Sequence, residues 1–188
     1  MTTVGQRALV AYERTDSRYD LHYAHWGAYQ WLLAASLAAV RPGSRFDPTD
    51  GTGTPTGVDP EPLATDCPFE DLLTSHVDWQ TYDACYVVAA DGTVQPYLAA
   101  WFGLPGHDTV RPRDGALVGV DPDHVEPDGE FLRGRVAGLK AATLAMVRDD
   151  RLPLATARSF LASEVQSWHA EGRTVHLGPD ADPDGWDG

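Results

Sequence analysis

The chain has 188 residues, of which 43% are hydrophobic, and its 28 acidic and 14 basic residues give a formal net charge of −14 at pH 7. This length and composition are typical of one globular domain with its own core. The longest apolar run, residues 31–40, is far shorter than the roughly 20 residues that cross a bilayer, so we expect a soluble, cytoplasmic protein without an export signal.

Two β-rich runs open the chain, residues 5–14 and 19–26. The polar sequence TDSR separates them, and this arrangement predicts a β-hairpin. Gly27 ends the second strand, and the apolar stretch 28–40 predicts a short helix that stops before a Pro-Gly pair. Residues 41–68 are rich in Pro, Gly, Thr and Asp, which predicts a long mobile loop on the surface.

The middle of the chain predicts a short helix over residues 68–76 and a second hairpin. Its strands are residues 81–90 and 93–102, joined by an Asp-Gly pair of the kind that tight turns prefer. Pro96 has no N–H for a ladder, so we expect the second of these strands to lie at a sheet edge or to carry a bulge. Residues 115–120 predict a fifth strand.

The last third of the chain is predicted to be helical, over residues 131–147 and 153–168. A short polar linker joins the two helices, which indicates an αα-hairpin. Apolar residues recur on one face of each helix at helical spacing. The positions are Leu132, Val136, Leu139 and Met146 in the first helix, and Leu154, Ala157, Leu161, Val165 and Trp168 in the second.

Hairpins followed by helices favour the α+β class. We expect an antiparallel sheet built from two β-hairpins, with a short helix after the first hairpin and a C-terminal αα-hairpin packed on the sheet. Residues 1–178 form the single expected domain. The acidic tail, residues 179–188, is predicted to be disordered.

The most aromatic stretch is YDLHYAHWGAYQW, residues 19–31, where the second strand gives way to the first helix. Alternate strand residues face opposite sides, so His22 and His25 share a metal only if the strand breaks or bulges near Gly27. Packing against the core is the competing interpretation of these residues. We expect any ligand or partner site at this position. Its expected contact residues are His22, His25, Trp26, Gly27, Tyr12, Glu13 and Tyr23.

Acidic residues gather again in DPDHVEPDGE, residues 121–130, which lacks the spacing of a calcium-binding loop. Carboxylate clusters arise easily in a chain with so many aspartates. The competing enzyme hypothesis is a metal-assisted hydrolase, in which a histidine of residues 19–31 binds the ion together with a carboxylate of this segment. Its candidate metal ligands are His22, His25, Asp121, Asp123 and His124.

The sequence RALVAYER, residues 7–14, followed by YDLHYAHWGA, residues 19–28, resembles the N-terminal signature of an uncharacterised haloarchaeal family, a domain of unknown function without an assigned activity. The charged residues resemble those of haloarchaeal proteins too, because Asp outnumbers Glu and Lys140 is the only lysine. At about 1 M salt the Debye length is about 3 Å, so dense surface carboxylates repel one another little. The resemblance implies a halophilic protein and leaves its function open.

The chain contains no glycine-rich phosphate loop, no serine nucleophile elbow and no HExxH motif. No basic stripe accompanies the aromatic residues, so we do not expect nucleic acid as a partner. We expect an accessory or interaction domain that works without catalysis or a cofactor and binds an unknown protein or small molecule. Both hypotheses, the interaction domain and the hydrolase, agree with the sequence. The sequence does not indicate an oligomeric state.

Overall fold

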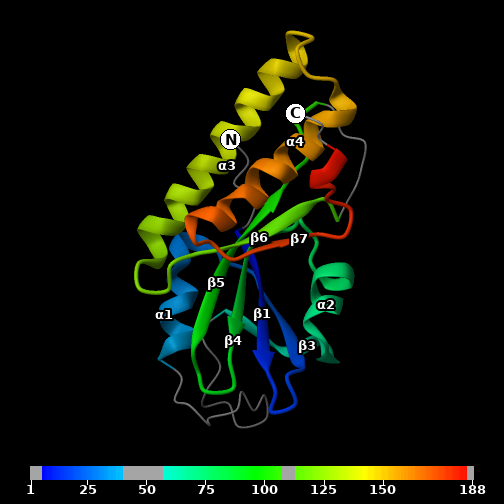
Figure 1. Ribbon diagram of the computed structural model, residues 1–188. Coiled ribbons are helices and arrows are strands. Elements are labelled where there is room, and N and C mark those ends of the chain that lie inside the picture. The colour runs from blue at the N-terminus through cyan, green and yellow to red at the C-terminus, as the bar shows by residue number, and fades with distance from the viewer. Residues whose placement is uncertain (1–5, 40–56, 107–112, 186–188) are drawn as a thin grey trace.

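The computed structural model describes residues 6–39, 57–106 and 113–185 (Figure 1). Within these residues, seven strands form one sheet in the order β3-β2-β1-β4-β5-β6-β7. The strands are β1 (Arg7–Glu13), β2 (Tyr19–Ala24), β3 (Val58–Cys67), β4 (Tyr82–Val88), β5 (Val94–Trp101), β6 (Gly115–Gly119) and β7 (Val175–Leu177).

Helices lie on both faces of this sheet. A 3-10 turn, η1 (Tyr29–Trp31), leads into α1 (Leu32–Ala38), and α2 (Phe69–Asp71) continues into a π-helical turn, η2 (Leu72–His76). The C-terminal part holds α3 (Val125–Arg148), α4 (Leu154–Gln166) and two further 3-10 turns, η3 (Ser167–Glu171) and η4 (Pro183–Gly185). None of the helices in the described parts of the chain is long and apolar enough to span a membrane.

Both expected hairpins are present, and so is the C-terminal helical hairpin. Ala8 pairs with Ala24 in the first antiparallel β-pair, and Ala84 pairs with Leu98 in the second. The expectation of a purely antiparallel sheet is wrong, because β1 and β4 pair in parallel and join the two hairpins into one mixed sheet. A parallel pair needs a long crossover, which here runs through β2, α1, β3 and α2.

Strand β3 occupies residues that the sequence assigned to a loop. It pairs with β2, Pro62 lying opposite His22 and Val58 opposite Ala24. Only one side of an edge strand needs hydrogen bonds, so the prolines are tolerated there and the loop-like composition is compatible with a strand. The rest of the expected loop, residues 41–56, lies outside the described residues.

Strand β7 and the turn η4 also depart from the sequence prediction. β7 is only three residues long and completes the sheet beside β6, with Val175 opposite Val118. The expected tail is residues 179–188, and within its described part, residues 179–185, the turn η4 packs against α4. A Cβ atom added at Gly185 would lie only 2.6 Å from the hydroxyl oxygen of Ser159, so the backbone of η4 lies close against α4.

Strand β5 lies between β4 and β6, so the expectation of an edge or a bulge at Pro96 is wrong. The carbonyl of Pro96 accepts the N–H of Val120, just beyond the last residue of β6. An N–H at residue 96 would point to the same side, toward the Val120 carbonyl. The Gln95 side-chain amide donates to that carbonyl at 2.9 Å and takes the place of the missing N–H.

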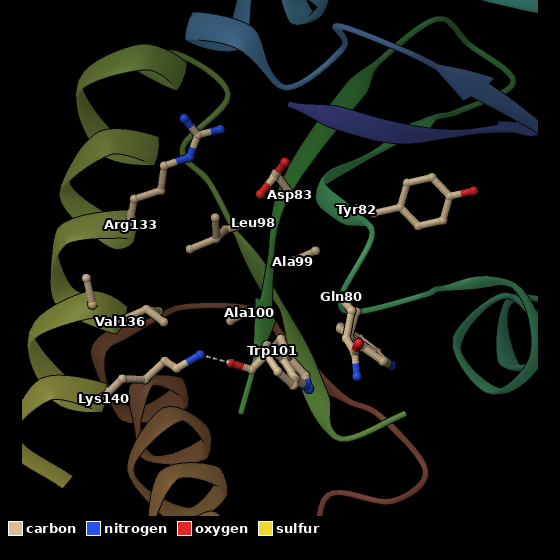
Figure 2. Close-up of a pocket in the computed structure, with 12 residues that line it drawn as sticks. Gln80, Tyr82, Asp83, Leu98, Ala99, Ala100, Trp101, Arg133, Val136 and Lys140 are labelled. Atoms are coloured by element: carbon tan, nitrogen blue, oxygen red, sulfur yellow. Dashed lines mark hydrogen bonds between the residues drawn. The ribbon is translucent and has the colours of Figure 1, made fainter. Parts of the chain in front are cut away.

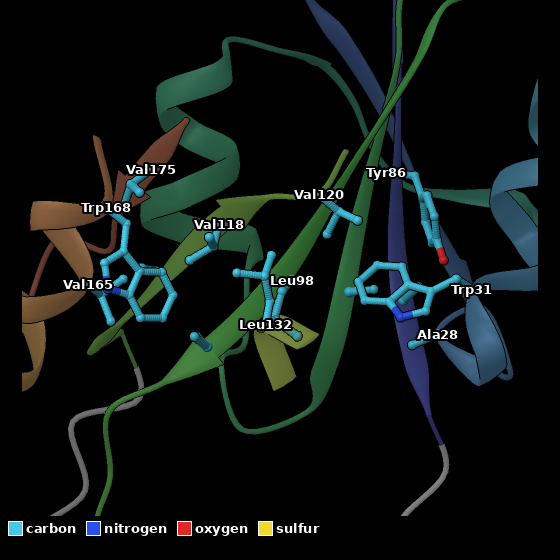
Figure 3. Close-up of a cluster of buried hydrophobic side chains, with 14 of the residues drawn as sticks. Ala28, Trp31, Tyr86, Leu98, Val118, Val120, Leu132, Val165, Trp168 and Val175 are labelled. Atoms are coloured by element: carbon cyan, nitrogen blue, oxygen red, sulfur yellow. The ribbon is translucent and has the colours of Figure 1, made fainter. Parts of the chain in front are cut away.

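The sheet buries side chains on both of its faces. Ala8 and Val10 belong to the larger core beneath α1, α3 and α4, whereas Leu9 and Ala11 belong to a smaller core beneath α2 and η2. The run of apolar residues in β1 therefore reflects burial on two sides. Figure 3 shows part of the larger core, with Trp31 beside Tyr86 at one end and Trp168 beside Val165 at the other.

The predicted helix faces are mostly confirmed. Leu132 in α3 and Leu161 and Val165 in α4 are buried, and Val136, Leu139 and Met146 pack against this core. Leu154 is the exception, since it is exposed at the first residue of α4. The αα-hairpin thus covers the sheet with the faces that the sequence indicated.

An ion pair ties the first turn of α3 to the end of β6. Arg173 binds both carboxylate oxygens of Asp128, at 2.6 Å for Oδ1, and also donates to the Gly119 carbonyl. The Asp128 carboxylate accepts the Asp121 N–H at 2.8 Å as well. Hydrogen bonds from Arg173 lower the pKa of Asp128. The carboxylate therefore stabilises the fold in its ionised form.

Replacing Asp128 by asparagine should lower the free energy of unfolding at pH 7 by about 2 kcal/mol, the usual contribution of a charge-assisted hydrogen bond. The folded-state pKa of Asp128 is depressed, so this contribution is complete above the unfolded-state pKa of about 3.9 and is lost as the pH falls through the folded-state value. Urea unfolding between pH 2 and pH 7 measures it. Asp123→Asn, an exposed change in the same segment, is the control and should have almost no effect.

Candidate functional site

The end of β2 packs tightly against the larger core at Gly27. A built Cβ at this glycine would lie 2.7 Å from the Cβ atoms of both Ala8 and Ala24 and 3.0 Å from Leu33. The Tyr86 hydroxyl donates to the Gly27 carbonyl at 2.9 Å. The groups that approach Gly27 closely are therefore core residues of the chain itself.

The backbone that follows Gly27 is held from two sides and is strained. The Ala28 N–H donates to the Gln6 carbonyl at 3.1 Å, and the Arg133 guanidinium donates to the Ala28 carbonyl at 2.8 Å. Gln30 and Trp31 have φ angles of 48° and 59°, in the left-handed region that side-chain-bearing residues rarely adopt. Such conformations cost about 1–3 kcal/mol each and persist only where surrounding contacts enforce them.

Trp31 supplies those contacts. Its side chain is 2% exposed and lies edge-on to Tyr86, with ring centroids 6.2 Å apart. The Arg133 guanidinium lies over the indole ring, 4.9 Å from its centre. A Cβ atom added at Gly129 would lie only 2.2 Å from the nearest atom of the same ring. Only a glycine at position 129 of α3 leaves room for this ring. Trp31 thereby fixes the start of α1 against α3.

Three large apolar side chains near Trp31 point to solvent. Trp26 is 56% exposed, Tyr29 47% and Leu32 60%, all within seven residues of the chain. Single exposed apolar side chains are ordinary, but three of them within seven residues of the chain make this segment a candidate interaction site. We call Trp26, Tyr29 and Leu32 the junction surface. The exposed His25 ring packs perpendicular to Trp26, with centroids 5.1 Å apart, and borders this surface.

The two histidines have different environments. His22 is 4% exposed, its Nδ1 lies 2.9 Å from the Asp59 carbonyl oxygen, and its ring lies edge-on to Tyr12. It therefore helps to hold the edge strand β3. His25 is exposed, and its Nδ1 lies 2.8 Å from the Tyr23 hydroxyl. His22 pairs with Val10, which belongs to the larger core, and Tyr23 pairs with Leu9, which belongs to the smaller core. Successive residues of β2 therefore face opposite sides of the sheet, as expected.

Tyr12 and Glu13 do not lie at the junction. Glu13 pairs with Tyr19 at the opposite end of the first hairpin, and its carboxylate accepts the Ala90 N–H near the second hairpin turn. Tyr12 packs against the larger core, where burial raises the pKa of its hydroxyl. Of the expected contact residues, Tyr23 contacts His25 and His25 contacts Trp26, next to Gly27 in the chain. His22 instead packs against Tyr12, and Glu13 lies at the other end of the hairpin.

The candidate metal ligands are also spread over the molecule. His124 Nδ1 lies 3.1 Å from an Asp121 oxygen, and Asp121 accepts the Asp123 N–H. This segment follows β6, four inter-strand spacings from His22 in β2, or about 19 Å in a regular sheet. Across residues 6–39, 57–106 and 113–185, no three His, Cys, Asp or Glu side chains are grouped so that they could hold a metal ion.

Sequence reasoning did not single out Tyr29 and Leu32. Trp26, Tyr29 and Leu32 recur at every third position, so large apolar residues are spaced regularly across the junction. That spacing is the signal that could have identified them. It was obscured because residues 28–40 were assigned to one uniform helix.

Comparison with known protein families gives a match over most of the chain. The model of a family of unknown function, DUF6735, matches residues 4–54 and 48–177, and the match includes β1–β7 and the junction surface. No curated protein and no solved structure matches the chain.

Replacing Gly27 by alanine should lower the free energy of unfolding by about 2 kcal/mol, because the added methyl group overlaps the side chains of Ala8 and Ala24. Gly134→Ala is the matched control. Gly134 lies exposed inside α3 with open space around it, so the same change there should stabilise the protein by roughly 0.5–1 kcal/mol. Equal effects of the two changes on urea unfolding would contradict the packing described here.

Proposed function

We propose that this chain, which belongs to the family of unknown function DUF6735, is an interaction domain that binds a partner protein through the junction surface. The observation that carries the proposal is the exposure of Trp26, Tyr29 and Leu32 on a backbone that hydrogen bonds hold in place. Tryptophan and tyrosine are enriched among the residues that dominate binding energy in protein interfaces.

The strain at Gln30 and Trp31 supports a functional role for the junction. Two left-handed residues cost roughly 2–6 kcal/mol together, whereas burial of one tryptophan contributes roughly 4–6 kcal/mol. These contributions are similar in size, so stability gains little from this backbone. The strained backbone holds Tyr29 and Leu32 exposed to solvent while Trp31 stays in the core.

The chemistry of the partner follows from this surface. Helix α1 contains no charged residue, and the chain as a whole carries a net charge of −14. A complementary partner presents an apolar groove to the aromatic side chains, with neutral or basic residues around it. Covering the exposed half of a tryptophan contributes about 2–3 kcal/mol, so two or three such side chains suffice for a specific complex.

We further propose that the protein acts in the cytoplasm of a haloarchaeon. The excess of aspartate and the single lysine support this environment, in which molar salt screens the repulsion between carboxylates. Apolar docking suits such a solvent, because ionic strength weakens exposed ion pairs and leaves apolar contacts in place.

Affinity for the partner should accordingly not fall between 0.5 M and 3 M potassium chloride.

A photo-crosslinking amino acid in place of Trp26 should capture one partner protein in cells. The same amino acid in place of Leu63, which is 52% exposed on β3, is the matched control and should not capture it. Capture of nothing beyond the Leu63 control, or of only a second copy of this chain, would contradict the proposal.

The captured protein is then purified and titrated against defined variants. The double change Trp26→Ser and Leu32→Ser should weaken binding about 30-fold or more, because two exposed anchors each contribute about 1 kcal/mol or more. Leu63→Ser should leave the affinity unchanged within about twofold. Equal affinities of the double variant and the Leu63 variant would rule out the junction surface as the binding site.

A further inference from the structure

An arginine without a partner lies at the start of β1. The Arg7 guanidinium forms no hydrogen bond or ion pair with any of the described residues. Its Nε is enclosed and the side chain as a whole is partly buried, so its outer nitrogens are the ones that solvent reaches. Every other arginine in the described ranges pairs with a carboxylate, apart from the exposed Arg148. In a chain with 28 acidic residues, an unpaired guanidinium in this position calls for an explanation.

The Arg7 side chain lies on the side of the sheet that holds the smaller core. Arg7 precedes Leu9 of that core by two residues, and alternate strand residues share a face. Its parallel partner Tyr82 packs against the same core. Figure 2 shows Tyr82 extending away from Arg133 and α3. Burial raises the pKa of the Tyr82 hydroxyl, and the charge of Arg7 lowers it in part, so the guanidinium lies near this hydroxyl.

The carboxylates nearest to this position are engaged elsewhere. Figure 2 shows Asp83 on the α3 side of the sheet, toward Arg133. Burial raises the pKa of Asp83, and the charge of Arg133 lowers it more than the charge of Arg7 does. Asp78 accepts the Thr81 hydroxyl at 2.7 Å and backbone N–H groups of its own turn. Arg7 therefore keeps its positive charge for a ligand on the other side of the sheet.

A series of ring contacts leads from Arg7 to the junction surface. The Tyr82 ring lies 6.3 Å from the Tyr23 ring, and the Tyr23 ring lies 6.0 Å from His25, between ring centres. His25 in turn packs against Trp26. Arginine, tyrosine and tryptophan are the residue types that dominate binding energy in protein interfaces. Arg7, Tyr23 and Tyr82, which we call the Arg7 site, therefore extend the junction surface by a cationic group.

We propose that the Arg7 site binds a carboxylate that the partner protein presents beside the junction surface, an inference that rests on the proposed function. The guanidinium donates two parallel hydrogen bonds to the carboxylate, and the tyrosine rings pack against the apolar stem that carries it. A single guanidinium balances the charge of one carboxylate, whereas a phosphate group carries more negative charge than it balances. This acidic group of the partner lies beyond the apolar groove that receives Trp26.

Small probes test the Arg7 site without the partner. Benzoate should bind about tenfold more tightly than benzamide, which has a similar shape and no charge, because only the carboxylate forms charge-assisted hydrogen bonds. Phenyl phosphate tests the phosphate alternative and should bind no more tightly than benzoate. The Arg7 Nε–H signal in NMR follows all three titrations. Equal affinity of benzoate and benzamide, or tighter binding of phenyl phosphate, would overturn the proposal.

Variants locate the bound carboxylate. Arg7→Gln should lower the affinity for benzoate about tenfold, and Arg7→Lys, which keeps the charge without the planar fork, should lower it less. Arg148→Gln removes the other unpaired arginine of the described residues and is the matched control, with an unchanged affinity within about twofold. Urea unfolding shows that each variant remains folded. Undiminished binding of benzoate by Arg7→Gln would contradict the assignment.

The captured partner separates this inference from the proposed function. Arg7→Gln should weaken the complex about tenfold, and Arg148→Gln should leave it unchanged. If the double change at Trp26 and Leu32 weakens the complex and Arg7→Gln does not, the proposed function stands and the role of Arg7 is wrong. If no partner is captured at Trp26, the proposed function is wrong, and the benzoate titration alone decides whether Arg7 binds a carboxylate.

Discussion

The burial of Trp31 is the constraint on which the junction surface depends. Its ring occupies a space that Gly129 leaves open on α3, and it packs against Tyr86 on β4 and beneath Arg133. To reach that position the backbone adopts two successive left-handed residues. The turn at η1 therefore separates one aromatic side chain, which enters the core, from its neighbours Tyr29 and Leu32, which remain exposed.

Arg133 joins the junction to α3. Its guanidinium lies over Trp31, donates to the Ala28 carbonyl and, on the exposed side of α3, donates to Glu130. The backbone that carries the junction surface is therefore held by α3 as well as by the sheet.

The periodicity of the sequence predicted the two hairpins and the αα-hairpin, because these depend on local turns and on faces that recur within one helix. It could not predict the parallel pairing of β1 with β4, which depends on contacts between distant segments. It assigned β3 to a loop because Pro60 and Pro62 are typical of loops, although an edge strand tolerates them. At the site it identified Trp26 and Gly27. It missed Tyr29 and Leu32, whose exposure depends on the left-handed backbone at Gln30 and Trp31.

The central claim is that the junction surface is displayed by an ordered backbone. Native-state hydrogen exchange of the Ala28 amide tests it most directly, because this N–H donates to the Gln6 carbonyl and Ala28 is fully buried. The structure predicts that this amide exchanges nearly as slowly as the amides of β1, through large-scale unfolding rather than local opening. Exchange close to the rate of an unstructured peptide, with β1 still protected, would show that Tyr29 and Leu32 belong to a loosely held segment and would contradict the account.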